Sequence, residues 1–301
     1  MTCNRLPMPL AALFPLLRRN GSWLPFALFL LLLFSVIAGS AQNLPPPLPG
    51  DQTVPLQEEP NPYHYRVSRT ATPPAIDGRI DDPAWLQAPW TCDFTDIEGD
   101  QKPAPFWRTR AKLLWDDHYL YIAAELEEPH LWATYTDDES VIFHENDFEV
   151  FIDPGNDGTL YYELEINALG TKWDLLLTRP YREGGFPINA WEITGLKKGI
   201  YLDGTLNDPS DLDRSWSLEL ALPWKVLREC APHHRKPAPG DTWRINFSRV
   251  QWNRTIVDGN YVKKTDPLTG KLLPEHNWVW SPQGVINMHL PEKWGMMKFA
   301  P

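Results

Sequence analysis

The sequence predicts an all-β protein, built as a two-sheet antiparallel β-sandwich with one or two short helical turns. Segments of alternating apolar and polar residues follow one another from residue 108 onward, separated by Gly, Pro, Asn and Asp. No long amphipathic helix is apparent, and only Asp82-Pro83-Ala84-Trp85 and the segment 223–230 favour a helical turn. Since no internal repeat is visible and 301 residues suffice for a substantial core, we expect one folded domain.

The strand pattern recurs along the chain at short intervals. The expected strands are 108–115, 119–126, 147–153, 161–167, 171–178, 192–201, 215–221, 242–251 and a last short piece near Lys298. Several of the 15 tryptophans fall at apolar positions of these strands or at conspicuous motifs. We therefore expect a core that contains Trp85, Trp115, Trp216, Trp224 and Trp243.

The segment 146–167 is the most informative, because it predicts a hairpin around a Pro-Gly-Asn-Asp-Gly turn. Alternation sends six apolar side chains toward a core, namely Phe148, Val150, Ile152, Tyr162, Leu164 and Ile166. The opposite face then gathers Asp147, Glu149, Glu163 and Glu165. Like charges opposed across strands destabilise a sheet, so these acids require cations, a metal or a hydrogen-bonding ligand.

The amino-acid composition excludes one class of binding partner, nucleic acid. The formal charge of -11 argues against nucleic acid, because a nucleic-acid binder needs a basic surface. The 31 prolines cluster partly in a segment from residue 42 to 64 that predicts an extended linker. Ahead of it, residues 1–41 carry arginines followed by the apolar run 24–37 and small residues. This pattern predicts a cleaved signal peptide or, as the alternative, an N-terminal membrane anchor.

The N-terminal segment therefore places the folded part, residues 65–301, outside the cytoplasm, as a secreted, periplasmic or cell-surface domain. An oxidising compartment would allow Cys92 and Cys230 to pair. Sequence alone leaves that disulfide open, together with signal cleavage and the oligomeric state.

Six motifs occur in an order that resembles the family 9 carbohydrate-binding modules and related DOMON-like domains. They are the segments 76–85, 114–123, 146–153, 216–224, 239–247 and 291–295, so the resemblance covers nearly all of residues 66–301. The resemblance implies an immunoglobulin-like or DOMON-like sandwich that binds a ligand on the polar face of one sheet. It also implies structural calcium in some members and an association with polysaccharide breakdown.

One departure from the family concerns the two tryptophans that sandwich a terminal sugar in its well-understood members. The corresponding positions here hold His144 and either Met288 or His289. The sequence therefore predicts the fold more firmly than it identifies a sugar.

We expect carbohydrate contacts at His144, Glu149, Glu163, Glu165, Asn167, Asn246 and Trp278. Ionised carboxylates accept hydrogen bonds from sugar hydroxyls with fixed direction, and a flat indole packs on a pyranose. Trp278, with Trp280 and Trp252, lies in a polar segment that predicts an exposed loop. The alternative for the acids is a solvated face neutralised by arginines such as Arg244, and for His144 a plain loop histidine.

The turn Asp153-Pro154-Gly155-Asn156-Asp157-Gly158 offers oxygen ligands for calcium through Asp153, Asn156 and Asp157. The alternative is an ordinary turn, since these residue types also favour turns without metal.

The leading hypothesis is an exported, non-catalytic protein that binds a mono- or oligosaccharide, with polysaccharide-degrading enzymes as partners and no nucleic acid. The alternative from another class is a glycoside hydrolase that uses two of the acids. A haem-binding or structural DOMON-like domain is the third hypothesis, since Met288 and His289 are axial-ligand types, although no haem-attachment motif is present.

Overall fold

The structure is a computed structural model that describes residues 62–301. This part of the chain is all-β, as predicted, with one α-helix of four residues. The strands are β1 (His64–Arg69), β2 (Thr95–Asp96), β3 (Thr109–Trp115), β4 (Tyr119–Glu127), β5 (Asp147–Asp153), β6 (Tyr161–Asn167), β7 (Lys172–Leu177), β8 (Pro187–Ile188), β9 (Lys197–Asp203), β10 (Ser215–Pro223), β11 (Thr242–Gln251), β12 (Arg254–Val257), β13 (Asn260–Lys263), β14 (His276–Val279) and β15 (Gly295–Phe299).

The helical pieces are short and lie in the connections. They are α1 (Trp224–Leu227) and the 3₁₀ turns η1 (Pro83–Gln87), η2 (Gly99–Gln101), η3 (Ile142–His144), η4 (Tyr181–Glu183), η5 (Pro232–His234) and η6 (Pro291–Lys293). The two predicted helical turns are confirmed as η1 and α1. Among residues 62–301, no helix has the length and apolar character needed to cross a bilayer.

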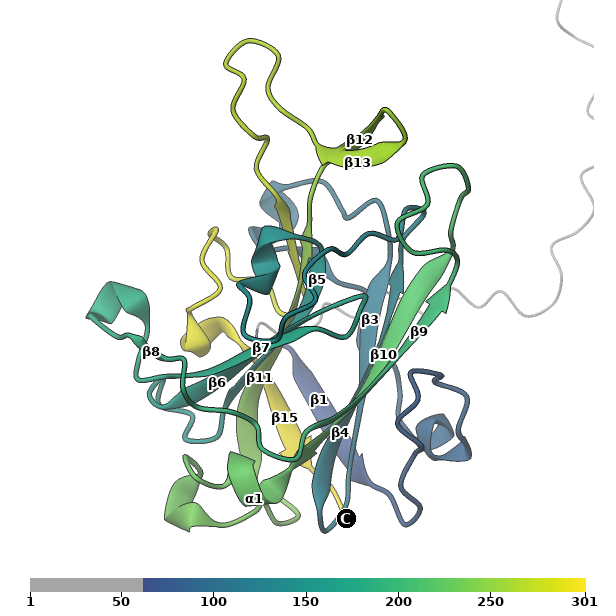
Figure 1. Cartoon of the computed structure of the whole chain (residues 1–301). Helices are drawn as coiled ribbons and strands as arrows, with labels where there is room; N and C mark the ends of the chain where they lie inside the picture. The colour runs from purple at the N-terminus through teal and green to yellow at the C-terminus, as the bar shows by residue number, and fades with distance from the viewer. Residues whose placement is uncertain (1–61) are drawn as a thin grey trace, which may run out of the picture. The chain divides into compact units, whose positions relative to one another are not determined.

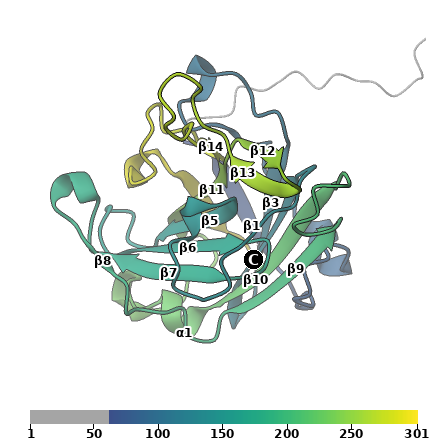
Figure 2. The same ribbon diagram turned by 45° about the horizontal axis from the view of Figure 1, so that its top comes forward.

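The strands form two sheets that share β1 (Figures 1 and 2). Sheet A has the order β8-β7-β6-β5-β11-β15-β1, with β14 paired to β11 and β2 paired to β14. Sheet B has the order β1-β3-β4-β10-β9. A separate hairpin, β12–β13, stands apart from both sheets. The sheets pack face to face, which is consistent with the predicted sandwich.

The antiparallel prediction is wrong for one strand. β1 runs parallel to β15 and parallel to β3, whereas the other strand pairs in residues 62–301 are antiparallel. The physical reason is the connection, because a long segment of about forty residues separates β1 from β3 and permits a parallel crossover that a hairpin forbids.

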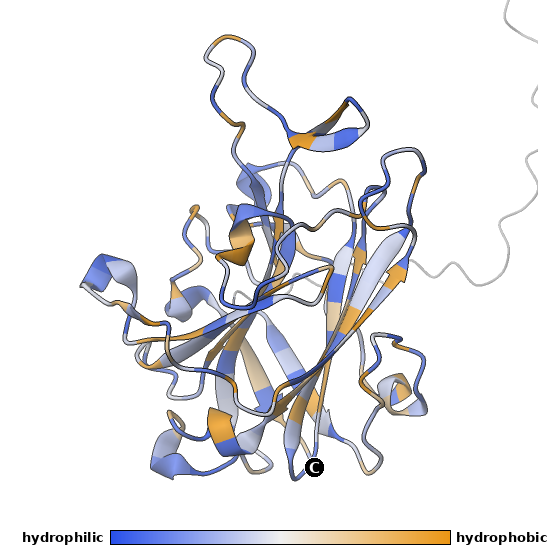
Figure 3. Ribbon diagram, viewed as in Figure 1, coloured by the Kyte–Doolittle hydropathy of each residue, from blue (hydrophilic) through white to orange (hydrophobic). Residues whose placement is uncertain are grey.

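A common core lies between the two sheets. Leu113 and Ile122 of sheet B belong to the same buried cluster as Phe148 and Ile166 of sheet A. Figure 3 shows the corresponding alternation of apolar and polar residues along the strands. The six apolar side chains predicted to face a core all belong to this cluster, which confirms the predicted parity of the hairpin. The five tryptophans expected inside are each at most 3% exposed.

Most predicted strands are confirmed within two residues of their ends, and 147–153, 161–167 and 242–251 are matched at both ends. The segment 192–201 is the exception, because strand structure begins only at Lys197. Residues 192–196 instead form a hydrogen-bonded turn in which the Leu196 N–H donates to Ile193 C=O. Six strands were not predicted, namely β1, β2, β8, β12, β13 and β14.

The predicted segment 1–41 and residues 42–61 of the predicted linker 42–64 lie outside the described residues. The structured chain begins one residue earlier than expected, since β1 starts at His64. Cys230 is a free thiol, so the Cys92–Cys230 disulfide that the sequence left open is not formed.

Candidate functional site

Four carboxylates gather on the outer side of sheet A, the side that faces away from the common core. We call Asp147, Glu149, Glu163 and Glu165 the acidic face. Glu149 of β5 pairs directly with Glu165 of β6, and Asp147 pairs with Asn167 in the same ladder. Because each strand alternates its side chains, the apolar residues between these acids enter the core and the acids emerge together. The predicted clustering of the four acids is confirmed.

The acidic face is buried, which the sequence did not predict. Each of its four residues is at most 5% exposed. Single oxygens of Asp147, Glu149 and Glu165 lie within 4.8 Å of one another. The Val250 N–H donates to Asp147 Oδ1 at 3.2 Å, and the Phe143 N–H donates to Glu165 Oε2 at 2.9 Å. Asp147 Oδ2 is buried and has no hydrogen-bond partner.

Burial raises the pKa of every carboxyl group on the acidic face, because a charged form loses its hydration there. Repulsion from Glu149 further raises the pKa of the other three groups. The pKa of Glu149 itself is raised to about 7, by burial and by Glu275, against a lowering effect of the nearby Ser248 hydroxyl. Burial and mutual repulsion therefore make simultaneous ionisation of the four carboxyl groups unfavourable.

Basic side chains do not neutralise the acidic face. Arg244, the predicted candidate, instead donates to the Pro291 C=O at 2.7 Å. The buried Arg249 and Arg254 both pair with Glu128. The arginine-capped alternative is therefore wrong for these acids within residues 62–301.

A loop that contains η3 borders the acidic face at the Glu165 end. Phe143, which binds Glu165 through its backbone N–H, is 37% exposed, and the adjacent His144 is exposed as well. The half-buried Trp252 donates its indole N–H to the Phe143 C=O at 3.0 Å. Lys263 of β13 lies over the Trp252 ring and donates to the His144 C=O. The β12–β13 hairpin thus holds this loop in place.

Aromatic residues border the acidic face on the β7 side. Trp173 pairs with Glu165 across β6 and β7, and its ring lies 6.3 Å from that of Phe143. Tyr181 is 45% exposed, and its pKa is raised by burial and by Glu163 and Glu165. The Tyr181 ring packs edge-on against His289 at 4.7 Å. These rings surround the acids with surfaces that suit C–H contacts.

Two of the seven predicted sugar contacts, Asn167 and Asn246, have side chains that hold the backbone together. Asn167 donates to Tyr135 C=O and Glu145, and accepts from the Leu169 and Thr171 N–H groups. Asn246 donates to Ser281 C=O and accepts from the Ser281 and Phe247 N–H groups. Both side chains are fully buried, and their burial is tolerated because each one is hydrogen-bonded to backbone groups.

Trp278 also differs from expectation. It lies in β14 and is 2% exposed, with Arg249 over its ring, so the predicted exposed loop is wrong. Trp280 is buried too, and among the three proposed stacking tryptophans only Trp252 keeps partial exposure. The polar and Pro residues of this segment predicted a loop, whereas the segment forms the short strand β14, which pairs with β11 in sheet A.

The turn predicted to bind calcium is organised by hydrogen bonds to backbone. Asp153 Oδ1 accepts from the Gly155 and Asn156 N–H groups, and Oδ2 accepts from Gly158. Asp157 Oδ1 accepts from the Thr159 N–H, and Asn156 donates to Thr242 C=O. These contacts favour the ordinary-turn alternative, and calcium at Asp153, Asn156 and Asp157 stays a prediction.

The residues considered for haem lie near the acidic face. His289 Nδ1 is 3.0 Å from the Tyr161 hydroxyl, and burial lowers the pKa of His289 to about 4. Met288 packs against the outer apolar cluster of Phe151 and Trp294. His289 is thus a neutral ring engaged with a tyrosine.

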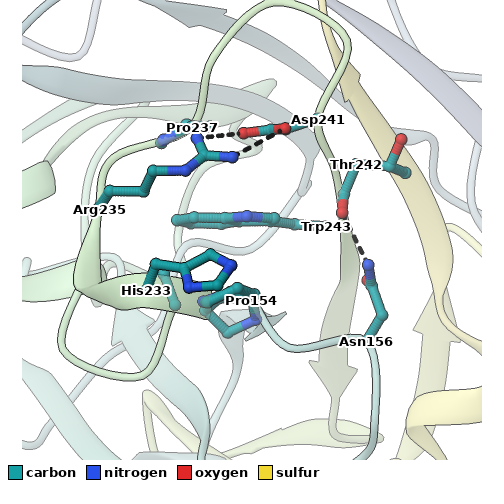
Figure 4. Close-up of a pocket in the computed structure, with 10 residues that line it drawn as sticks. Pro154, Asn156, His233, Arg235, Pro237, Asp241, Thr242 and Trp243 are labelled. Atoms are coloured by element: carbon teal, nitrogen blue, oxygen red, sulfur yellow. Dashed lines mark hydrogen bonds and ion pairs between the residues drawn. The ribbon is translucent and has the colours of Figure 1, made fainter.

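Two hollows lie beside residues discussed above, one at Trp278 and one at the 153–158 turn. One of about 530 Å³ is lined by Phe106, His276 and Trp278, with Glu275 at its border. The other, of about 180 Å³, lies at the Asp153 end of β5, where Trp243 is flanked by Arg235 and His233 (Figure 4). In the second hollow Arg235 pairs with Asp241 at 2.6 Å, so its charges already satisfy each other.

Residues 76–179 match the family described as carbohydrate family 9 binding domain-like, a segment that contains the whole acidic face. This segment is similar to the family 9 carbohydrate-binding modules. The predicted resemblance is confirmed.

Solved structures share the fold of this protein. A family 9 module from Caldicellulosiruptor kristjanssonii, in complex with cellotriose, has a TM-score of 0.50 at 17% identity and covers 79% of this chain and 93% of its own. A Bacteroides uniformis protein, named as a candidate carbohydrate-binding protein, has a TM-score of 0.55 at 18% identity and covers 78% of this chain and 98% of its own.

Curated relatives match over a shorter range. Exoglucanase XynX of Acetivibrio thermocellus is 34% identical over 102 residues, and endo-1,4-beta-xylanase A of Thermoanaerobacterium saccharolyticum is 35% identical over 102 residues. Each match covers 34% of this chain and 8% of the relative, so this chain spans only a small part of the length of these enzymes.

The site residues that sequence reasoning missed are Phe143, Trp173 and Tyr181. Phe143 stands directly before the predicted His144, and Trp173 occupies the outward parity of a predicted strand, so both carried a signal. Tyr181 lies in a loop whose return toward β6 no local pattern indicates.

Proposed function

We propose that this protein is a non-catalytic carbohydrate-binding module that holds a saccharide over the acidic face. The observation that carries the proposal is a set of buried carboxylates without basic partners, bordered by partly exposed aromatic rings. Sugars combine hydroxyl donors with apolar C–H faces, so a saccharide complements both parts of this surface. Glu163 and Glu149, the less deeply buried acids, accept hydroxyl hydrogen bonds.

Phe143 and Tyr181 take the place of the two family tryptophans as ring-contacting groups in this proposal. Both are exposed enough to present a face or an edge to a pyranose. His144, next to Phe143, adds a polar ring at the border. The finer fold assignment, a DOMON-like sandwich that binds ligand on the outer side of sheet A, is part of the same proposal.

The family comparisons support a plant-polysaccharide ligand. The cellotriose complex of the Caldicellulosiruptor module and the xylanase names of the curated relatives both concern β-linked sugars. We therefore propose cello- or xylo-oligosaccharides as the ligand class. Enzymes that degrade these polysaccharides are the proposed partners.

Export is proposed on the N-terminal sequence alone. The arginines, apolar run and small residues of segment 1–41 resemble a secretory signal. The mass of the mature protein recovered from its source tests this, since cleavage after Ala41 removes 41 residues.

Isothermal titration calorimetry with glucose, cellotriose and xylotriose tests sugar binding, using folded full-length protein with calcium supplied. We expect Glu163→Gln to weaken binding about tenfold, because an NH2 donor replaces one oxygen of the carboxyl group that contacts the saccharide. Tyr181→Ala should weaken it by a similar factor. The matched control is Asp157→Asn, an exposed carboxylate in the 153–158 turn that should leave the Kd unchanged.

Absence of heat with all three sugars and with a broader glycan array would remove the proposal. An equal loss in Glu163→Gln and Asp157→Asn would show that the acidic face is not the binding surface.

A second candidate, glycoside hydrolysis, is favoured by one observation. The pKa of Glu149 is raised to about 7 beside other carboxylates, as a general acid requires. Release of nitrophenol from chromogenic glycosides, abolished by Glu149→Gln, would support it, whereas no release across a panel would exclude it.

A further inference from the structure

The hollow beside Trp278 is walled by aromatic and aliphatic side chains. The Phe106 ring stands perpendicular to two others, and its centroid lies 4.7 Å from that of Trp278 and 5.3 Å from that of His276. The His276 and Trp278 rings stack on each other at 5.7 Å. Ile97 and Ile286 contribute to the apolar lining of this hollow of about 530 Å³. The function proposed above does not use this hollow.

We propose that this hollow binds a neutral phenolic ring, of the kind that plant cell-wall polymers carry as phenylpropanoid esters. Rings at right angles form a corner in which a third ring can stack on one wall and present its edge to the other. A hollow of this size with a mainly apolar lining and a few polar groups is typical of small-molecule sites. Attachment of the ring to a polysaccharide rests on the proposed function, whereas binding of the ring itself does not.

Charged groups at the border of the hollow favour a neutral phenol over an anion. Glu275 is half-buried and forms no hydrogen bond or ion pair within residues 62–301, so its carboxylate is available to accept a phenolic hydroxyl. Lys102 is already paired with Glu98 at 2.9 Å. The remaining charges of Asp96 and Glu275 therefore repel a ligand that carries a free carboxylate.

His276 presents an uncharged ring to the hollow. Burial lowers its pKa, against a raising effect of Asp96 and Glu275. The Asn253 side-chain amide donates to His276 Nε2 at 3.0 Å, which fits the neutral ring. An uncharged aromatic wall suits an uncharged aromatic ligand.

The hollow lies beside the acidic face. β14, which supplies His276 and Trp278, pairs with β11, and β11 pairs with β5. Adjacent strands lie about 4.8 Å apart, so β14 is roughly 10 Å from β5. Glu275 at the border of the hollow acts on the acidic face through its charge, which raises the pKa of Glu149. A saccharide on the acidic face can therefore place an aromatic substituent in the hollow.

Ligand-observed NMR titration of the full-length protein near neutral pH tests the ring site without any sugar. The probe is methyl ferulate, a neutral phenol. We expect saturable binding that weakens at least about threefold for ferulate, whose carboxylate the border repels, and by a similar factor for the phenol methyl ether of the probe. Equal Kd values for the three compounds would overturn the proposal, and so would binding that never saturates.

Variants locate the bound ring. Phe106→Ala should weaken methyl ferulate binding about tenfold, because it removes one wall of the aromatic corner. Glu275→Gln should weaken it about threefold and reduce the difference between the phenol and its methyl ether, because a neutral amide accepts a weaker hydrogen bond. The matched control is Phe186→Ala, since Phe186 is 60% exposed where Phe106 is 54% exposed, and it should leave the Kd unchanged. An equal loss in Phe106→Ala and Phe186→Ala would overturn the proposal.

The ring site and the sugar site can fail separately. Phe106→Ala should leave the Kd for xylotriose unchanged, and Tyr181→Ala should leave the Kd for methyl ferulate unchanged. Displacement of methyl ferulate by xylotriose would show that the hollow is a sugar subsite, which would overturn the proposal.

A ligand that carries both groups tests their connection. A xylo-oligosaccharide with a feruloyl ester should bind at least about tenfold more tightly than the same oligosaccharide without the ester, because the second contact is intramolecular. Equal Kd values for the two oligosaccharides would overturn the attachment of the ring to a polysaccharide.

Discussion

The position of Glu149 in strand β5 places its side chain on the acidic face. Its strand position is dictated by Phe148 and Val150, which enter the core on either side of it. The side chain must therefore emerge opposite Glu165, into a place where water is largely excluded. Burial and Glu275 then raise its pKa to about 7.

This raised pKa predicts how stability depends on pH. The folded state binds the Glu149 proton more tightly than the unfolded state, so the stabilisation is complete below the ordinary glutamate pKa and is lost as pH rises through about 7. For the metal-free protein we expect Glu149 alone to account for a loss of about 3 kcal/mol between pH 4.5 and pH 8. Urea unfolding in EDTA at several pH values measures it.

Glu149→Gln should flatten this dependence, because an amide does not titrate. Parallel pH profiles for the two proteins would contradict the assignment.

At the scale of the element, the β5–β6 hairpin depends on its turn. Asp153 is fully buried and accepts three backbone N–H groups, from Gly155, Asn156 and Gly158. Asn156 and Gly158 both have positive φ, at 58° and 77°, so the turn requires residues that tolerate this region. The turn sets the register that brings Glu149 opposite Glu165.

We expect Asp153→Ala to lower the free energy of unfolding by about 2–3 kcal/mol, because three backbone donors lose their acceptor. Asp157→Ala is the matched control, since this exposed carboxylate accepts only from Thr159, and its cost should be less than about 1 kcal/mol. Chemical denaturation in EDTA checks both values. Equal costs for the two variants would indicate that the turn is not organised by Asp153.

At the scale of the molecule, β1 joins the two sheets. Residues 64–67 pair with β15 in sheet A, and residues 68–69 pair with β3 in sheet B. The fully buried Val67 packs in the common core. Because one strand belongs to both sheets, the sheets should unfold together.

Val67→Ala tests this coupling. We expect a loss of about 2 kcal/mol from the removed core contacts and a single transition that is coincident in far-ultraviolet circular dichroism and tryptophan fluorescence. Two separate transitions would show that the sheets are independently stable.

The alternation of apolar and polar residues predicted the features of the fold that depend on neighbouring residues in the sequence. It placed β5, β6 and β11 and the clustering of the acids, because strand parity is fixed by adjacent residues. The alternation did not predict β1 and β14, whose pairing partners are distant in sequence. Because β14 was not predicted, Trp278 was wrongly expected to be exposed. The burial of the acids was also missed, because it depends on loops such as η3 that return from elsewhere in the chain.

The two ends of the strand order are protected in different ways. β8 is only two residues long, and β9 begins with Lys197 and Lys198, the first of which lies over the Tyr119 ring. Short or lysine-bearing margins are poor templates for a neighbouring molecule's backbone. The protein should accordingly resist intermolecular strand pairing at high concentration, where many copies lie side by side.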